Sequence, residues 1–67
     1  MLVTTEWTLG NNANSVHIYE ISKLFELGEQ AIDTGNYVYA YVTPNSNDKT
    51  IQIRTNNENL YVSAIAL

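Results

Sequence analysis

The sequence predicts a small single-domain α+β protein in which one amphipathic helix packs on one face of an antiparallel β-sheet. Three observations indicate this class. Apolar and polar residues alternate in three segments between residues 37 and 66, which is typical of half-buried strands. Residues 22–34 carry apolar side chains at helical spacing. The chain of 67 residues has the length of one domain, and its 45% hydrophobic content suffices for a core.

The first predicted strand covers residues 2–9, where apolar and polar side chains alternate, and residues 10–15 form an asparagine-rich turn. Residues 16–21 fit either a second strand or the start of a longer helix. Their β-forming residues favour a strand, and a longer helix would place Glu20 among the apolar positions. We therefore predict the order β-β-α-β-β-β, with β-α-β-β-β as the alternative if residues 16–21 are helical.

The predicted helix covers residues 22–34. A helical projection gathers its apolar side chains on one arc, namely Leu24, Phe25, Leu27, Gly28, Ala31 and Ile32. Ser22 is the expected N-cap, and Gly35 stands where a left-handed C-cap residue belongs. Gly28 would lie inside this helix and would let it approach the sheet closely.

The last third of the chain predicts a three-stranded meander over residues 37–43, 50–55 and 60–66. If each loop closes symmetrically, Thr43 lies opposite Thr50 and Thr55 lies opposite Leu60. One face is then apolar and receives the helix: Val38, Ala40, Val42, Ile51, Ile53, Leu60, Val62 and Ala64.

The opposite face of this meander is the predicted binding surface, with the residues Tyr37, Tyr39, Tyr41, Gln52, Arg54 and Tyr61. In the symmetric register Arg54 lies between Tyr39 and Tyr61. Tyrosine and arginine are enriched at the centres of protein interfaces, where lysine and glutamate are depleted, and this face has neither. Three other interpretations stay open: a face that only stabilises its own sheet, a small-ligand wall, and a stacking platform for nucleic-acid bases.

A second candidate surface is an acidic stripe on the exposed side of the predicted helix, formed by Glu26, Glu29 and Asp33. Such a stripe fits a basic groove on a partner. It fits an ordinary solvated helix face equally well.

The composition argues against several kinds of chemistry. The net charge of −4 disfavours nucleic acid as a partner, and the absence of cysteine excludes disulfides. His17 is the single histidine, and no carboxylate is expected beside it, so we predict neither a metal nor a cofactor nor a catalytic site. No apolar run is long enough to span a membrane, and no secretory signal is evident, so a cytoplasmic location is expected.

We therefore expect a non-enzymatic protein-binding module, an inhibitor, adaptor or accessory factor of the size that phages and mobile elements often encode. The alternatives are an oligomeric small-ligand or nucleotide-binding protein, with a pocket between subunits around Arg54, and a structural subunit of a larger assembly. The small core of a chain with 67 residues also favours a homo-oligomer, most simply a dimer.

Overall fold

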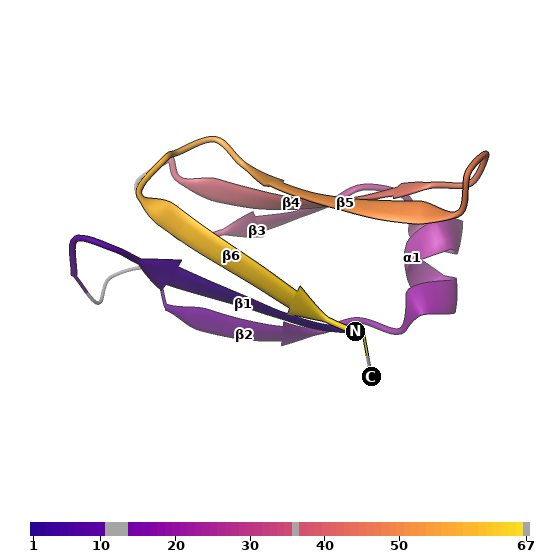
Figure 1. Cartoon of the computed structure of the whole chain (residues 1–67), viewed down its shortest axis with the longest axis horizontal. Helices are drawn as coiled ribbons and strands as arrows, with labels where there is room; N and C mark the ends of the chain where they lie inside the picture. Colours follow the sequence, from indigo (N-terminus) through magenta and orange to yellow (C-terminus); the bar gives the residue numbers. More distant parts are fainter. Residues whose placement is uncertain (11–13, 36, 67) are drawn as a thin grey trace.

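The computed structural model describes residues 1–10, 14–35 and 37–66, which form two three-stranded antiparallel sheets and a short helix (Figure 1). The first sheet has the strand order β2-β1-β6, and the second has the order β3-β4-β5. The elements are β1 (Leu2–Trp7), β2 (Ser15–Ile18), α1 (Ile21–Leu27), β3 (Gln30–Asp33), β4 (Tyr39–Asn45), β5 (Thr50–Thr55) and β6 (Leu60–Ile65). A small α+β protein with antiparallel strands was predicted, and that coarse prediction is confirmed.

The first hairpin forms where the alternating pattern predicts it. Strands β1 and β2 pair antiparallel, with Leu2 opposite Ile18 and Thr5 opposite Ser15. Both are shorter than the predicted segments 2–9 and 16–21, and the alternative that makes residues 16–21 helical is wrong. Part of the predicted turn, residues 11–13, lies outside the described residues.

The helix is much shorter than predicted, because it ends at Leu27 instead of residue 34. Gly28 has a φ of 85° and a ψ of −160°, and its N–H donates to the Leu24 carbonyl at 2.9 Å. Glycine reaches this backbone conformation far more easily than other residues, so it ends the helix and turns the chain into β3. The predicted N-cap is also wrong: Glu20 precedes the first turn, and the Ser22 hydroxyl donates to a Glu20 carboxylate oxygen.

The helix therefore does not lie across a sheet face as predicted. Figure 1 shows α1 at one end of the molecule, where it connects the end of β2 in the first sheet to the start of β3 in the second. It contributes Leu24 to the core, while Leu27 is 70% exposed. Ala31 was predicted on the apolar side of the helix, and this is also wrong, because the residue is exposed on β3.

The predicted C-terminal meander is wrong in its third strand. Strand β6 pairs with β1, not with β5, and Trp7 lies opposite Leu60. Residues 56–59 carry the chain from one sheet to the other, with the Leu60 N–H bonded to the Asn57 carbonyl at 3.1 Å. The meander that does form is β3-β4-β5.

The pairing of β4 with β5 has the predicted faces but a different register. Val42 lies opposite Ile53 and Tyr41 opposite Arg54, so the strands are shifted by two residues from the symmetric loop. A shift of two residues leaves each side chain on its own face, because the side-chain period of a strand is two. The apolar face therefore survives the shift.

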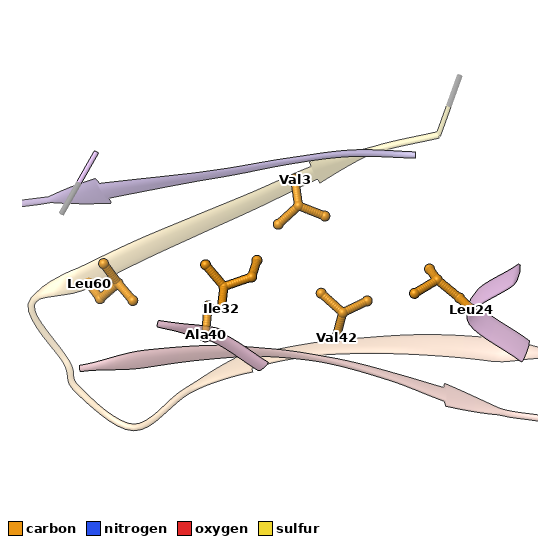
Figure 2. Packing of buried hydrophobic residues seen from close by; sticks show 6 residues of the cluster. All are labelled: Val3, Leu24, Ile32, Ala40, Val42 and Leu60. Atoms are coloured by element: carbon orange, nitrogen blue, oxygen red, sulfur yellow. The ribbon is translucent and has the colours of Figure 1, made fainter. Parts of the chain in front are cut away.

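The core lies between the two sheets, and Figure 2 shows its six buried side chains. Val3 and Leu60 point inward from the first sheet towards Ile32, Ala40 and Val42 of the second, and Leu24 enters from the helix. Partly buried side chains surround them, among them Val38, Ile51, Ile53 and Val62. Most of the predicted apolar face is thus in the core, whereas Ala64 is exposed.

Candidate functional site

The tyrosine face, as the structure has it, is the outer face of the sheet β3-β4-β5. Strand pairing places Asp33 beside Tyr39, Ala31 and Arg54 on either side of Tyr41, and Gln52 beside Thr43. These residues alternate along the strands with Ile32, Ala40 and Val42, which are buried in the core. The pleat therefore directs the tyrosines and the arginine away from the core.

The centre of this face is an ordered cluster around Arg54. Its guanidinium carbon lies 4.2 Å from the centre of the Tyr41 ring, and its Nη2 donates to Glu29 Oε2 at 3.1 Å. The same carboxylate oxygen accepts a hydrogen bond from Thr43 Oγ1 at 2.6 Å. The side chains of Arg54 and Glu29 remain 47% and 42% exposed. Strands β4 and β5 and the segment after the helix thus fix a cation on an aromatic ring in contact with solvent.

The hydrogen bonds from Thr43 and Arg54 hold the pKa of the Glu29 carboxyl below its ordinary value of 4.5. A depressed pKa in the folded state means that the unfolded chain binds the proton more readily at acidic pH. The ionised carboxylate therefore stabilises the fold above the unfolded-state pKa. This contribution is lost as the pH falls through the lower, folded-state pKa.

We expect the variant Glu29→Gln to be less stable than the wild type at neutral pH, with a difference that narrows as the pH falls below about 4. Thermal unfolding of both proteins from neutral to acidic pH measures this difference. The matched control is Glu26→Gln, because the ion pair of Glu26 with Lys23, at 3.6 Å, joins two side chains that are both largely exposed. If both variants show the same pH dependence, the Glu29 cluster does not form in solution.

Two of the predicted site residues lie away from this cluster. Tyr37 is in the turn before β4, with a φ of 62° and a side chain that is 88% exposed. Tyr61 is on β6, opposite Glu6, and so belongs to the other sheet. The predicted row of Tyr39, Arg54 and Tyr61 is therefore wrong. Arg54 stacks on Tyr41, whose ring centre is 6.1 Å from that of Tyr39.

The predicted acidic stripe does not exist as one helical surface. Glu26 is on α1, where it pairs with Lys23 at 3.6 Å, whereas Glu29 and Asp33 lie beyond the end of the helix. Asp33 Oδ1 accepts the Gly35 N–H at 2.8 Å and so shapes the turn after β3. Glu29 and Asp33 instead border the tyrosine face, a position that was not predicted. Gly28 is the residue that could have indicated this position, because it ends the helix before Glu29.

A chain of hydroxyl groups beside His17 was not predicted from the sequence. His17 Nε2 lies 3.0 Å from Ser15 Oγ, and Ser15 Oγ lies 2.5 Å from Thr5 Oγ1. Alternation along β2 puts Ser15 and His17 on one face, and the hairpin register brings Thr5 opposite Ser15. A serine beside an imidazole resembles a nucleophile and its base. Among the hydrogen bonds of the described residues, however, none joins a carboxylate to this imidazole to orient it.

The described residues contain no group of three or more histidine, aspartate or glutamate side chains that could hold a metal ion. Within the same residues, no helix is long and apolar enough to cross a membrane.

Comparison with known proteins adds no further evidence. No protein-family model matches the chain, and neither a curated protein nor a solved structure gives a significant match.

Proposed function

We propose that this protein is a non-enzymatic protein-binding module, an inhibitor, adaptor or accessory factor, and that it holds its partner on the tyrosine face. One observation supports this most: the Arg54 guanidinium rests on the Tyr41 ring and is fixed there by Glu29. Aromatic residues and arginine supply most of the hot spots of protein interfaces. Here both side chain types stand side by side, partly exposed, on two paired strands.

Preordering of these side chains favours binding. An interface loses about 0.5–1.5 kcal/mol for each flexible side chain that it immobilises, and arginine is among the most flexible. Arg54 already has a ring on one side and a carboxylate at one end before any partner arrives. Tyr39 and Tyr41 are held on a paired strand, and each is partly buried. The entropic cost of docking a partner on this face is therefore reduced.

The pairing with Glu29 also favours a protein partner over a small anionic ligand. A ligand anion would have to compete with the carboxylate that already binds the guanidinium at 3.1 Å. A protein partner can instead cover the ring and the guanidinium together, with its own apolar and carbonyl groups. Four statements stay predictions from the sequence: the ligand-binding alternative, the structural-subunit alternative, the cytoplasmic location and the exclusion of nucleic acid.

The proposal is tested by removing the Tyr41 ring while leaving its sheet intact. Tagged wild-type protein and Tyr41→Ala are used to capture partners from the native lysate, and the affinity for the recovered protein is then measured by titration calorimetry. We expect Tyr41→Ala to weaken binding by at least about thirty-fold, the loss of an interface hot spot worth 2 kcal/mol. The loss of the ring also frees Arg54 on one side.

The matched control is Tyr61→Ala, which removes the same side chain from the outer face of the other sheet, where Tyr61 is 62% exposed. Circular dichroism must show both variants folded. Equal affinity of Tyr41→Ala and the wild type for the partner would exclude the tyrosine face. A loss confined to Tyr61→Ala would move the binding site to the first sheet.

A further inference from the structure

The outer face of the first sheet carries an apolar patch that the core does not use. Strand pairing sets Ile18, Leu2 and Ile65 in one row across the three strands, and Val16 is two residues before Ile18 on the same face. Ile18 is 75% exposed, Val16 66% and Ile65 57%. We call the four residues Leu2, Val16, Ile18 and Ile65 the isoleucine patch. Exposed apolar patches on small soluble proteins often mark interaction sites.

The direction of this patch follows from the alternation along β1. Val3 and Thr5 point into the molecule and are 0% and 3% exposed. Leu2 and Thr4 therefore point to the opposite side of the sheet. Figure 2 shows Val3 directed towards the second sheet, so the isoleucine patch and the tyrosine face lie on opposite outer faces of the molecule.

The distribution of charge indicates what covers the patch. In the three strands of this sheet, Glu6 is the one carboxylate, and it lies opposite Tyr61, two rows away from the row of Leu2. The chain as a whole carries a net charge of −4. A basic partner would gain nothing from docking on this uncharged patch. A second copy of the acidic chain, in contrast, meets the least electrostatic repulsion there.

We propose that the isoleucine patch is the interface of a homodimer, in which the β2-β1-β6 sheets of two copies pack face to face about a two-fold axis. Such an interface is isologous, so the row of Ile18, Leu2 and Ile65 packs against the same row of the second copy. An axis that runs along this row, across the strands, keeps the two Glu6 carboxylates at opposite ends of the interface. Packed sheets of this kind lie about 10 Å apart with interdigitated side chains.

The available area fits a dimer of modest affinity. A face of three short strands, buried on both copies, removes roughly 1,000 Å² from solvent, which is near the lower limit for specific interfaces. We therefore expect a dimer that dissociates in the micromolar range. The tyrosine faces of the two copies then point outward on opposite sides. If the proposed function holds, the dimer presents two partner sites, but the dimer itself does not depend on that function.

The test is the variant Ile18→Lys, measured by sedimentation equilibrium of the full chain over micromolar to millimolar concentrations. The wild type is expected to approach twice the chain mass of 7.5 kDa. The lysine enters the interface twice, because of the two-fold axis, and is expected to raise the dissociation constant at least about ten-fold. It also makes the net charge less negative, so weaker association cannot come from increased overall repulsion.

The matched control is Leu27→Lys, which makes the same charge change at a leucine that is 70% exposed on α1, away from the patch. This variant must dimerise like the wild type. As a measurement without substitution, the methyl resonances of Ile18 and Ile65 should shift on dilution of the wild type, while those of Leu27 stay fixed. A monomeric wild type, or a dimer that Ile18→Lys leaves intact, overturns the proposal. Partner capture by Ile18→Lys through the tyrosine face should survive in either case, which separates the two proposals.

Discussion

Replacing Leu24 with alanine is expected to lower the free energy of unfolding by about 3 kcal/mol, within the range of 2–5 kcal/mol for such core truncations. Leu24 is 1% exposed and is the residue by which α1 enters the core. A domain of 67 residues has a free energy of unfolding of only about 3–10 kcal/mol, so this one substitution removes a large part of its stability. The midpoint of thermal unfolding should fall by more than about 10 °C.

The size of this effect depends on the position of Leu24, which Leu27→Ala can show. Leu27 is three residues further along the same helix, carries the same side chain and is 70% exposed. Its replacement with alanine should change the unfolding free energy by less than about 0.5 kcal/mol. Urea denaturation of both variants gives the two values. Similar losses from both would mean that the helix is not packed against the core by its Leu24 side.

Replacing Gly28 with alanine is expected to destabilise the protein by about 1–3 kcal/mol, the cost of holding a side-chain-bearing residue in a sparsely populated backbone conformation. Gly28 has a φ of 85°, and a Cβ added there would meet nothing within 4 Å. The cost therefore comes from the backbone and not from a clash. A glycine inside a helix would behave in the opposite way, since alanine is more favourable there by about 1 kcal/mol.

The sign of the Gly28→Ala effect thus decides between the long helix that the sequence suggested and the helix that ends at Leu27. The control is Gly10→Ala, because Gly10 does not have a positive φ and an added Cβ would lie at an ordinary 3.7 Å from Trp7. Gly10→Ala should be neutral or slightly stabilising. An increase in stability for Gly28→Ala in urea denaturation would contradict the helix end described above.

The end of the helix at Gly28 also matters for the candidate site. Because the chain is extended over Gln30–Asp33, Glu29 immediately precedes β3 and reaches Arg54 on β5. On a continued helix, Glu29 would follow Glu26 around the helical surface and would have no sheet neighbour. A strained Gly28→Ala protein is therefore expected to lose part of the Glu29 contact together with its stability.

Much of the tyrosine face could be predicted because it depends on alternation alone. Tyr39, Tyr41 and Arg54 share a face in any register that keeps Val42 and Ile53 in the core. The tyrosine opposite Arg54 could not be predicted. A register shift of two residues puts Tyr41 there in place of Tyr39, and it moves no side chain to the other face. Glu29 was assigned to a helix and so was missing from the face that it borders.

The helix prediction failed for a reason that lies in the pattern itself. Residues 30–33 place Ile32 on the apolar arc of a helix, but they also alternate as a strand, with Ile32 buried and Ala31 and Asp33 exposed. So short a segment fits both the helical and the strand periodicity. Tertiary contacts favour the strand, because these residues pair with the edge of β4 and Ile32 enters the core between the sheets.

The sequence by itself determined which side of each strand is apolar, because the direction of a side chain is a local property of the pleated backbone. It also determined the class of the protein and most of the core residues. Only the tertiary structure decided which strands are neighbours. Strand β6 would have the same apolar face whether it paired with β1 or with β5. It pairs with β1, and the two facing sheets then bury that apolar face between them. Pairing depends on the burial gained by the whole chain, so the pattern within one strand cannot specify it.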